Sequence, residues 1–199
     1  MSADGFSVAV RGRCQIAHSF KGEQFGPAQA LHGCTYVVDA VCKGAHLLPN
    51  CNYLVDICAA EAALHEALAI YNLRNLDELD EFANDNTTCE RLARAVWERV
   101  AAALERTQPA VEALQIIVAE SDVAHVEYER RLGPAAPPGM YTVSVRGRFM
   151  AARSLRGERF KKICAFLAGF RAIWDINPGL ALAKRRIQVQ RAFSRWRPE

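Results

Sequence analysis

The sequence predicts an α+β fold in which two strands, two helices and two further strands follow one another along the chain. Apolar and polar residues alternate over Ser7–Ile16, which is the two-residue period of a strand. Apolar residues recur at helical spacing after Asp56 and again after Thr87. A final apolar run ends at Glu120, before a polar turn. Each segment therefore has one face that can be buried.

The first two strands are predicted at Ser7–Ile16 and Leu31–Cys42. In the first strand, Val8 and Val10 fall on one face, and the second strand is rich in β-branched residues. Glycine and proline at Gly22 and at Gly26-Pro27 mark turns between the two strands.

Two helices should follow. Asp56 can cap the first, which should end near Asn72. Thr87 and Glu90 have the spacing of a capping box and predict the start of the second. Its expected buried stripe consists of Leu92, Ala95, Val96, Val100 and Leu104. The last pair of strands is predicted at Leu114–Glu120 and Ala124–Tyr128, with a turn at Ser121-Asp122.

The chain contains an internal repeat, in which a segment near the N-terminus recurs near residue 141. Residues Phe6–Phe25 align without gaps on Tyr141–Phe160, at an offset of 135 residues, and ten of the twenty pairs are identical. Such an offset indicates a duplicated domain, because solenoid repeats are shorter. We therefore expect a complete domain at 6–132, a Pro/Gly-rich linker at 133–140, and the start of a second copy within 141–199. From residue 161 the second copy diverges into a basic tail, which a truncated or frame-shifted copy explains better than a nucleic-acid-binding arm.

Composition excludes several classes of partner. With 25 basic and 22 acidic residues, the net charge of +3 is too balanced to favour nucleic acid or a membrane surface. No apolar run has the length of a membrane span, and Met1–Gly5 does not resemble a signal peptide. The seven cysteines include no Cys-x-x-Cys pair. We expect a cytoplasmic protein with no nucleic-acid and no membrane partner.

Three side chains are of the types that bind metal ions in proteins. In a strand over Leu31–Cys42, His32 and Cys34 lie on the same face, and His18 can join them from the neighbouring strand. Two imidazoles and one thiolate leave the fourth position of a tetrahedral zinc ion open, as in catalytic sites. The alternative is a surface histidine pair beside a small buried cysteine.

Six motifs in a fixed order resemble the 6-pyruvoyl-tetrahydropterin synthase and 6-carboxytetrahydropterin synthase family. They extend over about Phe6–Leu132 and comprise Ala17-His18, Leu31-His32-Gly33-Cys34-Thr35-Tyr36, Asn52-Tyr53-Leu54-Val55-Asp56-Ile57, Leu73-Arg74-Asn75-Leu76-Asp77-Glu78, Asn86-Thr87-Thr88-Cys89-Glu90 and Val118-Ala119-Glu120-Ser121. The resemblance implies the tunnelling fold, an antiparallel sheet with two helices on one face. It also implies a homo-oligomer, a trimer or hexamer, in which sheets join into a barrel.

The resemblance further implies a zinc-dependent lyase that acts on a dihydroneopterin triphosphate-like pterin, in the biosynthesis of queuosine or tetrahydrobiopterin. The zinc ligands carried over are His18, His32 and, where the family has a third histidine, Cys34. Glu120 matches the glutamate that accepts hydrogen bonds from the amino group and a ring nitrogen of the pterin.

The residues of the family's proton relay are absent from the matching positions. Ala28 replaces the family's cysteine, and Asn72 and Leu73 replace its Asp-His pair. Alanine, asparagine and leucine do not exchange protons near neutral pH, so the catalytic residues are unknown. Two hypotheses follow: a lyase with a different relay, or a catalytically degenerate pterin- or purine-binding or assembly module. We assign no chemistry to Thr88 and Glu90, which suit a helix cap, and we expect the carboxylates Asp77, Glu78, Asp80 and Glu81 to form a solvated turn.

Overall fold

The computed structural model describes residues 5–147. These residues form one six-stranded sheet with the strand order β3-β1-β2-β4-β5-β6. The strands are β1 (Phe6–His18), β2 (His32–Gly44), β3 (Arg74–Asn75), β4 (Ala113–Ala119), β5 (Ala124–Arg131) and β6 (Met140–Val145). The helices are α1 (Ile57–Ala69) and α2 (Cys89–Thr107), with 3₁₀ turns η1 (Glu23–Gln29), η2 (Leu76–Glu78) and η3 (Asp80–Phe82). The predicted α+β class is confirmed.

The strand pairing is antiparallel except at β3. Strands β1 and β2 pair over their whole length, from Phe6 opposite Gly44 to His18 opposite His32. The two residues of β3 run parallel to the end of β1. Both long strands extend beyond their predicted bounds: β1 continues to His18, opposite His32, and β2 continues to Gly44, opposite Phe6.

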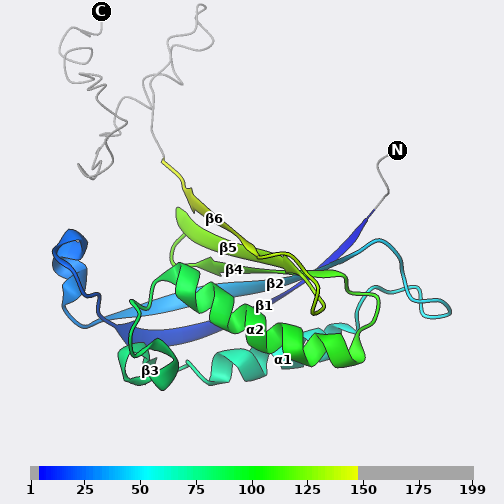
Figure 1. Ribbon diagram of the computed structural model, residues 1–199, viewed down its shortest axis with the longest axis horizontal. Helices are drawn as coiled ribbons and strands as arrows, with labels where there is room; N and C mark the ends of the chain where they lie inside the picture. Colours follow the sequence, from blue (N-terminus) through cyan, green and yellow to red (C-terminus); the bar gives the residue numbers. More distant parts are fainter. Residues whose placement is uncertain (1–4, 148–199) are drawn as a thin grey trace, which may run out of the picture. The chain divides into compact units, whose positions relative to one another are not determined.

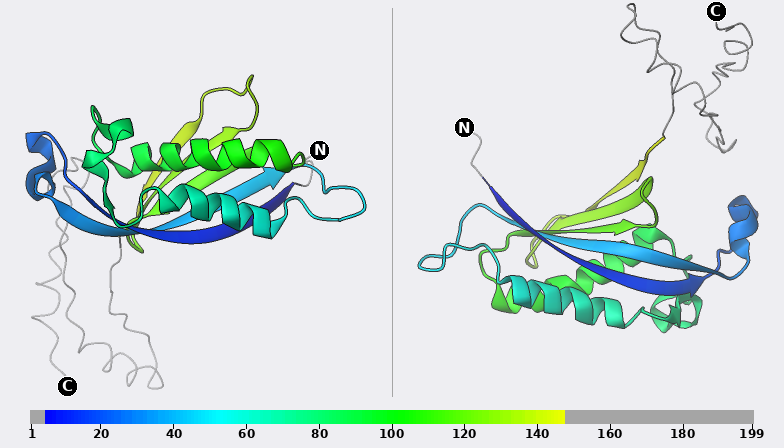
Figure 2. Two further views of the ribbon diagram at one scale, coloured as in Figure 1. Left: turned by 90° about the horizontal axis from the view of Figure 1, so that it is seen from below. Right: turned by 180° about the vertical axis from the view of Figure 1, so that it is seen from behind.

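Both α-helices lie on the same face of the sheet, as Figures 1 and 2 show. The core lies between the two layers. All five residues of the predicted α2 stripe are buried, and the Trp97 indole donates to the carbonyl of Leu114 in β4 at 2.9 Å. Close approach of α1 requires Gly12 in β1, since a Cβ there would lie 2.6 Å from a methyl of Leu68. No helix in the described part of the chain is long and apolar enough to span a membrane.

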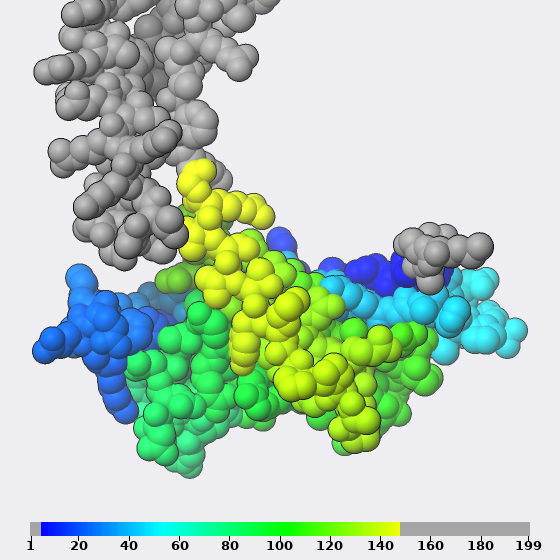
Figure 3. Space-filling view, turned by 45° about the horizontal axis from the view of Figure 1, so that its top comes forward, coloured from blue at the N-terminus to red at the C-terminus, as the bar shows by residue number. Residues whose placement is uncertain are grey.

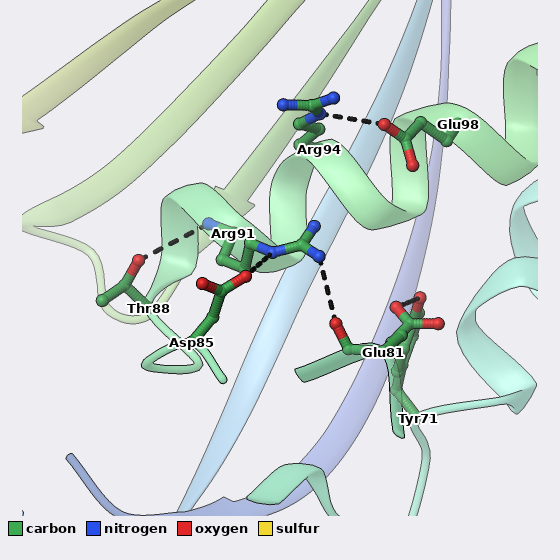
Figure 4. A network of polar contacts seen from close by, with 7 residues as sticks. All are labelled: Tyr71, Glu81, Asp85, Thr88, Arg91, Arg94 and Glu98. Atoms are coloured by element: carbon green, nitrogen blue, oxygen red, sulfur yellow. Dashed lines mark hydrogen bonds and ion pairs between the residues drawn. The ribbon is translucent and has the colours of Figure 1, made fainter. Parts of the chain in front are cut away.

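The N-terminus of α2 differs from the prediction. The cap is Thr88, whose hydroxyl accepts from the backbone N–H of Arg91 at 3.5 Å (Figure 4). The Thr87 side chain turns inward and is 1% exposed. The Arg91 guanidinium bonds Asp85 at 2.8 Å and the carbonyl of Glu81 at 3.1 Å, which ties η3 to the helix. The first helix, by contrast, has the predicted cap, Asp56, which accepts from the N–H of Cys58 and Ala59.

The segment predicted as a linker connects two neighbouring strands. Strand β6 pairs antiparallel with β5, so residues up to Gly147 belong to the same compact unit as the first domain. Five of the six residues of β6 are exposed, and Figure 3 shows this strand at the surface. Most of the expected second copy lies outside the described residues, and that assignment stays a prediction.

Candidate functional site

Two histidines lie side by side at one end of the β1–β2 pair, where β1 ends and β2 begins. His18 and His32 are direct register partners, and their ring centroids are 4.5 Å apart. His18 is 1% exposed and also contacts the ring of Phe20, with centroids 4.7 Å apart. The alternation of β2 places Cys34 on the same face, one position further along. The predicted histidine pair is therefore present in space.

Backbone carbonyls determine which nitrogen of each ring carries the proton. The Nδ1 of His18 lies 3.0 Å from the carbonyl oxygen of Thr87, and the Nδ1 of His32 lies 2.9 Å from that of Ala30. A carbonyl can only accept, so both Nδ1 atoms are donors, and in the neutral rings Nε2 holds the lone pair. Burial lowers the pKa of His18, which favours its neutral form. Such carbonyl bonds are typical of metal-binding histidines.

A carboxylate lies behind His18. The Asp77 side chain accepts from both the N–H and the hydroxyl of Ser19, each at 2.7 Å, and from the Thr87 hydroxyl at 3.2 Å. The same hydroxyl lies 3.2 Å from Nδ1 of His18. A chain of carboxylate, hydroxyl and imidazole therefore runs from η2 to the histidine pair, and the expectation of a solvated turn was wrong for Asp77. It was also wrong for Glu81, which bonds the Tyr71 hydroxyl and the Arg99 guanidinium.

A second group of polar side chains lies beside the pair, between β2 and the start of α2. The Cys89 thiol is 4.0 Å from a carboxylate oxygen of Glu120, and Tyr36 is buried next to it. Burial raises the pKa of Cys89 to about 12, and burial together with the Glu120 carboxylate raises the pKa of Cys34. Both thiols are therefore protonated at neutral pH. Burial also raises the pKa of Tyr36 well above its usual value.

The donors fit a zinc ion in part. Two imidazoles whose Nδ1 atoms donate to backbone carbonyls match two of the predicted ligands, since a neutral ring of this tautomer binds a metal through Nε2. Within residues 5–147, however, no group of three or more histidine, cysteine, aspartate or glutamate side chains is close enough together to hold a metal ion. The thiol of Cys34, whose ionisation is disfavoured, does not complete a three-ligand group with the pair.

The residues that stand in place of the family's proton relay form structural hydrogen bonds. Asn72 accepts from the backbone N–H of Gln15 at 2.9 Å, and the N–H of Leu73 donates to the Gln15 carbonyl at 2.6 Å. The carbonyl of Ala28 accepts from the N–H of Phe20 at 3.0 Å and holds η1 against the segment that follows β1. These residues fasten other parts of the chain to β1 or to the segment after it.

Comparison with known proteins identifies the family. The sequence model described as 6-pyruvoyl tetrahydropterin synthase matches residues 7–131, which is more than half of the chain. The chain belongs to this family. No curated protein matches it.

Solved structures of family members share the fold. The 6-pyruvoyl tetrahydropterin synthase of Caenorhabditis elegans matches with a TM-score of 0.53 and 17% identity, over 60% of this chain and 91% of the other. The enzyme of Plasmodium vivax matches with a TM-score of 0.50 and 14% identity, over 65% of this chain and 99% of the other. At such identities the likeness concerns the fold, a sheet with two helices on one face.

Within this pterin synthase fold, three residues of the site were missed by sequence reasoning. Thr87 and Asp77 were assigned to a cap and to a solvated turn, and Cys89 was given no role. The pair Thr87-Thr88 offers two possible caps, and only the inward turn of the first shows which one is used. A signal for Asp77 was available: Asn75, two residues before it, can accept from its N–H and fix the turn, as it does at 3.2 Å.

Proposed function

We propose that this end of the sheet binds a pterin with a dihydroneopterin triphosphate-like side chain, and that the protein is a zinc-dependent lyase of the pterin synthase type. The observation that carries the proposal is the pair of imidazoles, both donating through Nδ1 to backbone carbonyls, beside an exposed carboxylate at the end of β4. The membership in the 6-pyruvoyl tetrahydropterin synthase family supports the same ligand class.

Glu120 is the proposed pterin ligand. It follows β4 directly, and its carboxylate influences His18, Cys34 and Tyr36 electrostatically. A carboxylate that faces two adjacent N–H donors forms a charge-assisted pair of hydrogen bonds, which suits the amino group and ring nitrogen of a pterin. The ring would then lie across the face that His18, His32 and Cys34 share.

Zinc is the proposed cofactor, with His18 and His32 as its first two ligands. Cys34 is the proposed third ligand, and its thiol would have to move toward the histidine pair to complete the group. When bound, zinc would act as a Lewis acid that polarises oxygens of the pterin side chain. The chain's own residues prepare the site: the carbonyls of Thr87 and Ala30 hold both rings in the tautomer that a metal requires. Binding through Cys34 would require loss of its thiol proton, so zinc affinity should increase with pH.

A second candidate is a catalytically degenerate pterin- or purine-binding module. The residues Ala28, Asn72 and Leu73 favour it, because none of their side chains can exchange a proton and their hydrogen bonds, through the Asn72 amide and through the backbone of the other two, are structural. A turnover assay decides between the two candidates. Release of aldehyde or triphosphate from dihydroneopterin triphosphate supports the lyase, and tight binding without either product supports the module.

The ligand assignment is tested by titrating the protein with dihydroneopterin triphosphate and following binding calorimetrically. Replacing Glu120 with Gln should weaken binding by about 10- to 100-fold, since hydrogen bonds to a charged group contribute about 1.5–3 kcal/mol. Glu66→Gln, on the exposed side of α1, is the matched control and should bind like the wild type. Equal affinity of the Glu120 variant would remove Glu120 from the site.

The metal assignment is tested by measuring zinc content after dialysis. We expect His18→Ala, His32→Ala and Cys34→Ala each to lose zinc, with His125→Ala as the control because its ring bonds Glu127 on the other face of the sheet. Equal zinc content in all four variants would contradict the proposed ligands.

A further inference from the structure

An open hollow lies at the end of the sheet away from the histidine pair. Its volume is about 360 Å³, and its lining comes from the start of β1, the end of β2, the start of β4 and the end of β5. The β1–β2 ladder runs from Phe6 opposite Gly44 to His18 opposite His32. About 40 Å of strand therefore separates the hollow from the candidate site, and the two share no residue.

Four of the lining residues form one row across the sheet. Ser7 in β1 is the register partner of Lys43 in β2. Ala113 in β4 pairs with Lys43 on one side and with Arg131 in β5 on the other. Register partners have their side chains on the same face, and Leu114, the residue after Ala113, is buried in the core beneath the helices. The row therefore faces away from the helices.

A small side chain between two long ones creates the space. Ala113 contributes only a methyl group, and the backbones of Lys43 and Arg131 are two strand spacings apart, about 10 Å. In the next row of the sheet, the larger residues Val41 and Gln115 are the register partners, and neither belongs to the lining. The hollow thus has a floor at Ala113 and a cation on either side of it.

Hydrogen-bond donors are in excess in this hollow. The Lys43 ammonium donates to Glu129 at 2.8 Å and the Arg131 guanidinium to Glu112 at 3.0 Å, and each cation has further N–H groups beyond that bond. Glu112 has both oxygens engaged, because the other one accepts from the N–H of Ala45 at 3.2 Å. Glu129 is not part of the lining. The unused groups around the floor are therefore mainly positive donors, which favour an anion.

We propose that the hollow binds a small organic anion, with its oxyanion head over Ala113 between Lys43 and Arg131. Carboxylate and phosphate heads share the chemistry that a guanidinium recognises, through two parallel N–H bonds. The rest of the lining is uncharged and consists of Gly5, Phe6, Gly44 and Ala45 with Ser7. An apolar body of about one ring therefore completes the ligand.

The two ion pairs do not oppose this ligand. The side chains of Lys43 and Arg131 are 35% and 62% exposed, and ion pairs this exposed contribute little to stability. Both side chains are long and can bend over Ala113 while one N–H of each stays with its carboxylate. The anion replaces water at the remaining donors. This inference does not depend on the pterin or zinc proposal.

Charge variants of the full-length protein test the head of the ligand. Phenyl phosphate, titrated into the labelled protein and followed by amide NMR, should shift the signals of Gly44 and Ala45 and reach saturation. Arg131→Gln should weaken this binding about tenfold or more, since it removes a charge-assisted bond. Arg11→Gln is the matched control: Arg11 lies outside the lining and is paired with Asp39 at 2.6 Å, so its variant should bind like the wild type. No saturable shift in the wild type, or equal affinity for Arg131→Gln, would overturn the proposal.

A filling variant tests the space separately from the charge. Ala113→Phe keeps both cations, places a ring on the floor of the hollow and suits a strand, so it should fold and lose binding. Benzoate should bind at the same place as phenyl phosphate, and the tighter of the two identifies the head. Benzyl alcohol, which has the ring without the charge, should not bind. Wild-type affinity in Ala113→Phe, or equal binding of benzyl alcohol and benzoate, would refute the site.

Discussion

Replacing Thr87 with valine separates the structural role of this residue from the role of a helix cap. The side chain is 1% exposed and valine has nearly the same shape, so the substitution creates no cavity. It removes the hydroxyl that donates to Asp77 at 3.2 Å and lies 3.2 Å from Nδ1 of His18. The carbonyl of Thr87, 3.0 Å from the same Nδ1, remains.

The expected cost follows from the charge on Asp77. Loss of a hydrogen bond to an ionised group costs about 1.5–3 kcal/mol. In a domain of this size, 1 kcal/mol corresponds to a change in Tm of about 2–4 °C, so we expect Tm to fall by about 3–12 °C. Urea unfolding and calorimetry of Thr87→Val measure both quantities. In an Asp77→Asn background the cost should decrease, because the two residues share one bond.

Thr88→Val is the matched substitution at the neighbouring position. It removes the cap of α2 and should cost about 1 kcal/mol. If Thr87 were the cap instead, Thr87→Val would cost only about 1 kcal/mol and Thr88→Val almost nothing. In the structure as described, Thr88→Val carries the cost of the cap, and Thr87→Val carries the greater cost of the bond to Asp77. A larger loss of stability from Thr88→Val than from Thr87→Val would therefore refute the chain of hydrogen bonds from Asp77 to His18.

Two further predictions concern packing and pH. Gly44→Ala should destabilise the fold by about 1–3 kcal/mol, since its Cβ would lie 2.3 Å from the carbonyl oxygen of Ala110, a backbone atom that cannot turn aside. Gly33→Ala, where the nearest atom is 3.6 Å away, should unfold in urea like the wild type, and equal costs for the two variants would contradict this packing. Burial lowers the pKa of His18 below its ordinary value of 6.5, so the unfolded chain binds the proton first and stability decreases as pH falls through about 6.5. The slope should not exceed about 1.4 kcal/mol per pH unit for one proton, and a slope unchanged in His18→Asn would refute the assignment.

The regular elements could be predicted because each has one buried face. The α2 stripe recurs at helical spacing and lies against the sheet, so the periodicity of the sequence and the packing agree. The 3₁₀ turns and β3 lack such a signal. Strand β3 has two residues, and its place depends on the contact between Leu73 and Gln15, which are distant in sequence.

The residues of the candidate site can be divided in the same way, into those that the pattern of one strand predicts and those that depend on contacts between elements. Alternation along β2 was sufficient to place His32 and Cys34 on one face, and the expected pairing with the neighbouring strand added His18. Sequence reasoning could not supply the bond from Thr87 to Asp77 or the short distance from Cys89 to Glu120, because each joins residues from different elements. It also could not find that β6 joins the first sheet, since a repeat gives similarity between strands and not their pairing.

One glycine connects the repeat to the structure of the first unit. Gly12 in β1 is required by α1, because a Cβ there would lie 2.6 Å from Leu68. Its counterpart in the repeat is Gly147, and a Cβ at Gly147 would meet no described atom within 4 Å. The packing around the described copy therefore does not account for a glycine at this position. The repeat thus has the glycine that the packing of α1 favours in β1, at a position where no described helix lies against it, so similarity between the two strands does not predict similar packing.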